Sequence, residues 1–224
     1  EATSDLAVMA AQRALTAAGI TADQIELIIV ATITPDMQFP STACLVQQKL
    51  GAFRAAAFDL EAACSGFVYA LDVAAHFVQS HTYNTVLVIG AENMTAVSGA
   101  ETTRILGDCG YSGEAGHPPG GFPGIFASIA QDYFAAHGDH SATLARIAAK
   151  NHANGALNPW AHMRKDLGFE FCNTVSDRNP MIAAPLRKTD CSLVSDGAAA
   201  VILAADDVVA DFPRAVRLRA RVQV

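Results

Sequence analysis

One cysteine in this sequence stands where a strand is expected to lead directly into a helix. The stretch concerned is Asp59-Leu60-Glu61-Ala62-Ala63-Cys64-Ser65-Gly66-Phe67. The first backbone N–H groups of a helix lack partners and carry partial positive charge, so a thiolate at that position is stabilised. The neighbours Ala62, Ala63 and Gly66 are small enough to let an acyl group approach. Cys64 is therefore predicted to be a nucleophile, while a buried structural role is the alternative on position alone.

The other four cysteines have no comparable setting. Cys44 lies within an expected helix and is predicted to belong to the core, and Cys109, Cys172 and Cys191 are expected to be structural. The odd count of five includes no CxxC spacing and no Cys/His cluster, so the sequence predicts neither a disulfide framework nor a metal site. A reduced, cytoplasmic protein is the expectation.

The first ninety residues alternate between expected helices and expected strands. Ser4 is predicted to cap a first helix that ends at Gly19 and buries the face of Leu6, Met9, Ala10 and Ala14. The remaining segments are helices at 40–51 and 64–79, buried strands at 25–33 and 85–89, and a short strand at 57–60. Such an alternation with short links is typical of an α/β sheet covered by helices.

The pattern changes after Gly90. Residues 98–121 are rich in glycine and are expected to form a long ordered loop, and residues 155–190 are expected to be irregular. Two helices are predicted at 122–137 and 141–154, and a buried strand at 198–204. Residues 216–222 alternate between apolar residues and arginine, which predicts a strand with one apolar and one cationic face.

Composition bears on the kinds of partner that this chain can have. A formal net charge of −7 argues against general binding to nucleic acid. The apolar runs are far shorter than the roughly 20 residues of a membrane span, and no signal peptide is recognisable, so no membrane span is expected. Because 51% of the residues are hydrophobic and only 17% are charged, we expect much buried apolar surface or a face that meets a partner.

Two stretches of the chain resemble known enzyme families. Residues from Ser4 to about Gly90 resemble β-ketoacyl-ACP synthase III, through the motifs Phe39-Pro40-Ser41-Thr42-Ala43-Cys44 and Asp59 to Gly66. From Gly90 onward the chain is more similar to thiolases of the sterol-carrier-protein type, through motifs at 90–95, 122–127, 150–152, 158–159 and 195–200. Both families belong to the thiolase superfamily.

The resemblance implies a thiolase-like α/β fold, with a mixed five-stranded sheet layered with helices. It implies an N-terminal core over residues 1–204 with an insertion at about 91–190, followed by the start of a truncated C-terminal half at 205–224. Cys64 would accept an acyl group from coenzyme A or acyl carrier protein, with no tightly bound cofactor. A carbon–carbon bond of a β-ketoacyl thioester would then be formed, or cleaved in the reverse direction. Phe39 would shape the acyl pocket of a dimer partner, with an ordinary core aromatic as the alternative.

The sequence also departs from both families. It lacks the His, Asn and second-Cys motifs of their second halves, and the first core strand ahead of Ser4. We therefore expect a fragment or a subunit, working as a homodimer or as a hetero-oligomer with a chain that supplies the missing half, and no turnover by the isolated chain. The alternatives are a degradative thiolase or thiolase-like aldolase subunit, and a non-catalytic ketosynthase-like partner.

Cations are unevenly distributed along the sequence. No Lys or Arg lies between Arg54 and Arg104, so no cation close in sequence supports a thiolate at Cys64. A later group of cations could bind the phosphates of coenzyme A or an acidic carrier protein, with a solvated face as the alternative. This group comprises Arg146, Lys150, Arg164, Lys165, Arg178, Arg187 and Lys188.

Overall fold

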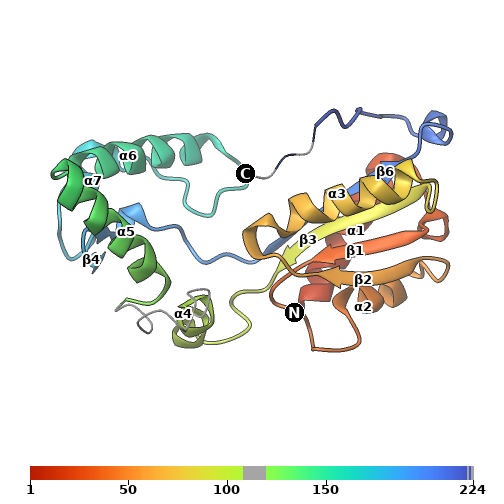
Figure 1. Cartoon of the computed structure of the whole chain (residues 1–224), viewed down its shortest axis with the longest axis horizontal. Helices are drawn as coiled ribbons and strands as arrows, with labels where there is room; N and C mark the ends of the chain where they lie inside the picture. The colour runs from red at the N-terminus through yellow and green to blue at the C-terminus, as the bar shows by residue number, and fades with distance from the viewer. Residues whose placement is uncertain (108–119, 221, 223–224) are drawn as a thin grey trace. The chain divides into compact units, whose positions relative to one another are not determined.

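The computed structural model describes residues 1–107, 120–220 and 222. Its internal contacts divide the chain into two compact units (Figure 1). Unit 1 comprises residues 1–96 and 195–224, and unit 2 comprises residues 97–194. The expected organisation into a core with an insertion at about 91–190, followed by a C-terminal segment from 205, stays a prediction.

Unit 1 is built on a four-stranded mixed sheet (Figure 1). Its strands are β1 (Leu27–Ala31), β2 (Ala56–Leu60), β3 (Thr85–Glu92) and β6 (Gly197–Ala204), in the order β2-β1-β3-β6. β1 runs parallel to β2 and β3, whereas β6 runs antiparallel to β3. The expected mixed α/β sheet is confirmed, but the described residues supply four strands to it rather than five. β6 lies at an edge and is only partly buried, so the prediction of a buried strand there was wrong in this respect.

Helices cover both faces of this sheet. α1 (Thr3–Ala18) and α2 (Thr42–Leu50) pack on the face that presents Ile28 and Val30, and α3 (Gly66–Gln79) packs on the face that presents Leu27 and Ile29. Successive strand residues point to opposite faces, so a strand covered on both sides must be apolar throughout. This explains the unbroken apolar run of β1. In the described part of the chain, no helix has the length and apolarity needed to cross a membrane.

The termini of α1 and α2 follow local sequence signals in all but one case. Gly19 and Gly51 end the two helices in the left-handed conformation, with φ of 71° and 74°. Ser41 caps α2, because its side chain accepts a hydrogen bond from the Cys44 backbone. The predicted cap of α1 at Ser4 was wrong: the helix begins at Thr3, and Ser4 lies inside it with its side chain committed to tertiary hydrogen bonds.

The buried face of α1 also differs from the prediction. Ala7, Ala11 and Leu15 are buried, whereas Met9 is 50% exposed. Small side chains let a helix approach a sheet closely, so Ala7 and Ala11 form most of this contact and Leu15 completes it near the end of the helix.

Unit 2 is mostly helical, with two short strands. It contains α4 (Gly99–Gly107), α5 (Phe122–His137), α6 (Ser141–Leu157), α7 (Gly168–Asn173) and the antiparallel pair β4 (Met181–Ala183) and β5 (Leu186–Arg187). α5 and α6 confirm the two predicted helices. α4 occupies part of the expected loop at 98–121, and α7 with the β4–β5 pair lies in the segment expected to be irregular, so both predictions were wrong there. The rest of the expected loop, at 108–119, lies outside the described residues and includes Cys109.

Short 3-10 helices link several of these elements. They lie at η1 (Ala22–Gln24), η2 (Ala63–Ser65), η3 (Lys188–Asp190) and η4 (Val209–Asp211). After η4, the described residues up to 220 form no strand, so the prediction of a strand at 216–222 was wrong for them. A strand is stabilised by pairing with a neighbour, and no paired strand is found beside this segment among the described residues.

Candidate active site

Cys64 lies on an exposed turn between β2 and α3. The turn is the 3-10 helix η2, and α3 begins directly after it at Gly66. Ser65, at the cap position, makes no side-chain hydrogen bond to the helix. The start of α3 therefore has no side-chain cap, and the Gly66 N–H donates to the Ala63 carbonyl instead. The positive end of the α3 dipole lies beside the thiol, which favours an anion there. The predicted placement of Cys64 at the start of a helix is confirmed.

The backbone before Cys64 is in an unusual conformation. Ala63 has φ of +45°, in the left-handed region that costs a non-glycine residue about 1–2 kcal/mol. Gly66 is buried, and a Cβ added there would lie 3.4 Å from the Cβ of Ala31. The start of α3 therefore packs closely against the end of β1. Strained backbone of this kind concentrates at functional sites.

The other described cysteines are less available for reaction. Cys44 is partly buried and accepts a hydrogen bond from the Ser41 hydroxyl over 3.2 Å. Burial raises the pKa of the Cys172 thiol, which is fully buried, and of the Cys191 thiol, which is partly buried. Among the described residues, Cys64 is the exposed free thiol. No group of three or more metal-ligating side chains occurs in the same ranges.

Phe39 lies in the loop at residues 32–41, which runs from β1 to α2. Its side chain is 81% exposed, so the alternative of an ordinary core aromatic was wrong. The proposed role in the acyl pocket of a dimer partner stays a prediction.

Three carboxylates fasten the loop at 32–41. Glu92, at the end of β3, accepts hydrogen bonds from the Ile33 backbone over 3.0 Å and from the Thr34 hydroxyl over 2.5 Å. Asp36 and Asp59 bind the N-terminal turns of α1 and α2. These roles were not predicted from the sequence. Asp59 and Glu92 each lie towards the C-terminal end of an apolar strand, where parallel strands bring loops together.

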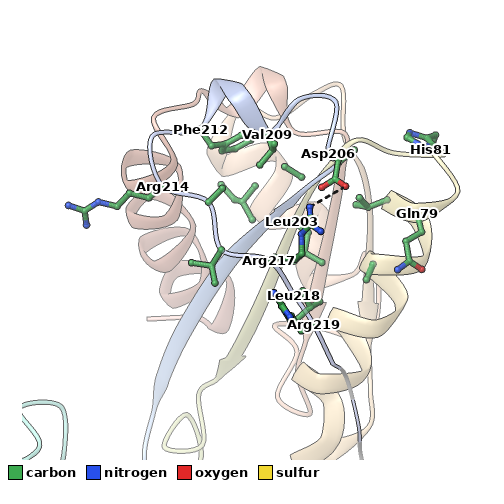
Figure 2. Close-up of a pocket in the computed structure, with 17 residues that line it drawn as sticks. Gln79, His81, Leu203, Asp206, Val209, Phe212, Arg214, Arg217, Leu218 and Arg219 are labelled. Atoms are coloured by element: carbon green, nitrogen blue, oxygen red, sulfur yellow. Dashed lines mark ion pairs between the residues drawn. The ribbon is translucent and has the colours of Figure 1, made fainter.

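A separate cavity of about 740 Å³ lies at the other end of α3 (Figure 2). It is lined by the last turn of α3, the end of β6 and the segment at 205–219, and Arg217 there forms an ion pair with Asp206 at 3.9 Å. α3 spans about 20 Å, at 1.5 Å per residue. The cavity is therefore remote from Cys64, which precedes the first turn of the same helix.

Several of the cations in unit 2 already contact other residues of that unit. Arg187 is buried and donates hydrogen bonds to the Cys172 carbonyl over 3.1 Å and to the Ser141 carbonyl over 3.4 Å, so the expectation that it binds phosphate was wrong. Arg146 and Arg178 stack on aromatic rings at 5.5 Å and 5.4 Å from the centroids of Phe169 and Phe171. Each of these three arginines therefore contacts another residue within unit 2.

Comparison with known proteins identifies the part of the chain around Cys64. The family model of 3-oxoacyl-[acyl-carrier-protein] synthase III matches residues 58–112. A β-ketoacyl-[acyl-carrier-protein] synthase III of Xanthomonas campestris is 59% identical over 97 residues, covering 43% of this chain and 30% of that protein. The enzyme of the same name from Bordetella petrii is 44% identical over 182 residues, covering 79% of this chain and 53% of that protein.

Solved structures of the same kind also match. The crystal structure of 3-oxoacyl-[acyl-carrier-protein] synthase III from Aquifex aeolicus is 50% identical, covers 42% of this chain and 31% of that one, and has a TM-score of 0.42. The chain thus spans between about a third and a half of the relatives that it matches. The family-model match, which includes Cys64, and the sequence identity to these relatives support the thiolase-like superfamily for this chain.

Proposed function

We propose that this chain is part of an acyltransferase that forms carbon–carbon bonds between acyl thioesters through Cys64. The observation that carries the proposal is the exposed thiol of Cys64 at the uncapped start of α3, within the segment that the synthase III family model matches. The relatives are β-ketoacyl-[acyl-carrier-protein] synthases, so the proposed metabolic setting is the synthesis of fatty or related acyl chains.

In the proposed first step, the Cys64 thiolate attacks the carbonyl carbon of an acyl thioester. A bond forms between Cys64 Sγ and that carbon, the bond to the donor sulfur breaks, and the departing thiolate takes up a proton. A carbanion from a second acyl unit then attacks the acyl-cysteine, which forms the carbon–carbon bond and releases the Cys64 thiolate. The reverse sequence cleaves a β-ketoacyl thioester, so a degradative thiolase or aldolase subunit is the alternative direction.

The proposed donors are thioesters of coenzyme A or of acyl carrier protein, with no tightly bound cofactor. We further propose that Phe39 contacts the acyl group bound to a partner subunit, in a homodimer or a hetero-oligomer. Its 81% exposure supports a contact outside this chain, because an aromatic ring of that size is costly to leave in water. We also propose that the residues beyond Gly90 are related to sterol-carrier-protein-type thiolases. The proposed location of the protein is the cytoplasm.

The direct test is whether Cys64 becomes acylated. The 224-residue chain is incubated with labelled acetyl-CoA, and the adduct is located by peptide mass mapping. We expect one acetyl group on Cys64, no label in the Cys64→Ser variant, and unchanged label in Cys44→Ser, the matched control for loss of another cysteine.

Two results would count against acyl transfer through Cys64. Label on a different cysteine would reassign the nucleophile. A chain that alkylates normally at Cys64 but accepts no acyl group from coenzyme A or acyl carrier protein would favour the non-catalytic partner subunit.

A further inference from the structure

We infer that the cavity at the C-terminal end of α3 binds a free fatty acid, that is, an aliphatic chain that ends in one carboxylate. The cavity is remote from Cys64, so this is a second site, and the inference does not rest on the proposed acyl transfer.

The segment at 212–219 closes one side of the cavity and is fastened where it begins. Phe212 packs against the core cluster that α1 and α2 form with the sheet. Pro213 lies so close to the end of α1 that a Cβ added at Gly19 would be 3.5 Å from Pro213 Cδ. The following residues pass beside the end of α3, which packs on the opposite face of the sheet (Figure 2). The segment therefore crosses the sheet edge at β6, and the space that it encloses lies within unit 1.

The wall of the cavity that α3, β6 and η4 provide is aliphatic. It includes Ala75 and Val78 of α3, Leu203 of β6 and Val209 of η4. Such a wall suits a ligand body that forms no hydrogen bonds. The cavity volume of about 740 Å³ lies in the range of small-molecule pockets, roughly 300–1,000 Å³.

The wall that the closing segment provides is cationic. Arg214, Arg217 and Arg219 all line the cavity, whereas the sequence of unit 1 has no Lys or Arg at 55–96 or at 195–213. Asp206 is the one acidic side chain among the described residues that line the cavity. Positive charge therefore exceeds negative charge beside an aliphatic wall, which is the environment that a fatty acid needs.

Arg217 is the residue that we expect to hold the carboxylate. Its ion pair with Asp206 spans 3.9 Å, and the two side chains are 77% and 90% exposed, so the pair contributes little to stability. A ligand carboxylate can take the place of Asp206, because arginine binds a carboxylate through two parallel hydrogen bonds. Arg214, by contrast, points away from the cavity in Figure 2. Asp206 thus competes with the ligand, and this competition predicts the sign of its substitution.

The test measures the binding of dodecanoate, below its micelle concentration, to the 224-residue chain by isothermal titration calorimetry. We expect one site, with affinity lowered by about tenfold in Arg217→Gln, the effect of losing one charge-assisted interaction. Arg214→Gln is the matched control for loss of a positive charge and should change the affinity by less than about threefold. These residues are exposed, so their substitution leaves the core intact.

The substitution Asp206→Asn tests the competition. It should raise the affinity for dodecanoate by about threefold, since it frees Arg217 from an exposed ion pair. Asp207→Asn removes the neighbouring negative charge, which does not line the cavity, and should have a smaller effect. An unchanged or lower affinity in Asp206→Asn would contradict the assignment of Arg217 to the carboxylate.

Two further probes separate the parts of the ligand. Dodecanol lacks the charge and acetate lacks the chain, so each should bind weaker than dodecanoate by about tenfold or more. Amide hydrogen exchange then locates the site. Dodecanoate should protect peptides from the end of α3 and from 202–219, but not those from α5, where Ile129 and Tyr133 also expose apolar surface.

Several results would overturn the inference. Absence of dodecanoate binding would remove the ligand, and equal binding of dodecanol would show adsorption of an apolar chain without recognition of the carboxylate. Protection at α5 in place of the end of α3 would move the site to unit 2. Protection of 202–219 that rises with protein concentration, without ligand, would identify the cavity as a contact between two copies of the chain. Failure of Cys64 to accept an acyl group would overturn the proposed function and leave this site unaffected.

Discussion

Replacing Ser4 by alanine is expected to destabilise unit 1 more than its small size suggests. Ser4 is fully buried, and its hydroxyl donates a hydrogen bond to Asp36 Oδ2 over 2.5 Å and accepts one from Lys49 Nζ over 2.6 Å. Alanine keeps the helical backbone and removes both bonds. The carboxylate of Asp36 then loses a donor in a partly buried site, while its bond from the Ser4 backbone remains.

The two lost bonds contribute unequally. A hydrogen bond to a charged group contributes about 1.5–3 kcal/mol when water cannot replace it. The side chain of Lys49 is 38% exposed and retains its ion pair with Asp5, so its bond to Ser4 adds little. We therefore expect Ser4→Ala to lower the free energy of unfolding by about 2 kcal/mol, and Lys49→Met to lower it by less than about 1 kcal/mol.

Peptide-resolved amide hydrogen exchange across a urea series is the suitable assay, because the chain has two compact units and need not unfold in one step. Peptides from α1 and from the loop at 32–41 should lose protection in Ser4→Ala, while those from α5 and α6 of unit 2 should not change. A loss in Lys49→Met as large as that in Ser4→Ala would refute the division of energy between the two bonds.

Three further predictions follow from the same structure. Iodoacetamide at neutral pH should label Cys64 first, and Cys172 and Cys191 should react later because burial raises the pKa of both thiols. Faster labelling of any other described cysteine would contradict the assignment of Cys64 as the most reactive thiol. The pKa of Asp5 is lowered, first by the Ala2 N–H and then by Lys49. Its contribution to stability is therefore present above the ordinary carboxyl pKa of about 3.9 and is lost as pH falls through the lower folded value. Asp5→Asn should accordingly be less stable than the natural chain at pH 7 in urea titrations, with the gap closing near pH 2. Gly121→Ala should destabilise unit 2 more than Gly138→Ala. Both glycines have positive φ, but only at Gly121 would the added Cβ meet a neighbour, at 2.6 Å from Thr103 Cγ2. Equal losses of stability in thermal melts of the two variants would contradict this prediction.

The sequence predicted the elements of unit 1 because their signals are local. Gly19 and Gly51 mark the ends of two helices through a left-handed conformation that glycine adopts without strain. The buried strands carry β-branched residues on both faces, which distinguishes them from half-buried strands. The position of Cys64 followed from the same signals, since it needed only the end of one element and the start of the next.

The predictions that were wrong or missing concern features that depend on residues distant in the sequence. Ser4 has the chemistry of a helix cap, but Asp36 and Lys49 draw its hydroxyl into a tertiary network that no local pattern reveals. The arginine-alternating segment at 216–220 has the period of a strand, yet period alone supplies no neighbouring strand. The carboxylates of Asp59 and Glu92 could be recognised only once the order of the strands was known.

The turn at Cys64 combines features that each oppose stability. Ala63 occupies a left-handed conformation that glycine would adopt with less strain, the start of α3 has no side-chain cap, and a thiol is left in contact with water. A structural cysteine needs none of these conditions and is usually buried, as Cys172 is. The surrounding fold holds the turn in place through the close contact of Gly66 with Ala31 and the double attachment of Asp59. Because the surrounding fold maintains a strained backbone at Ala63 beside an exposed thiol, the geometry favours chemistry at Cys64 over a role in packing.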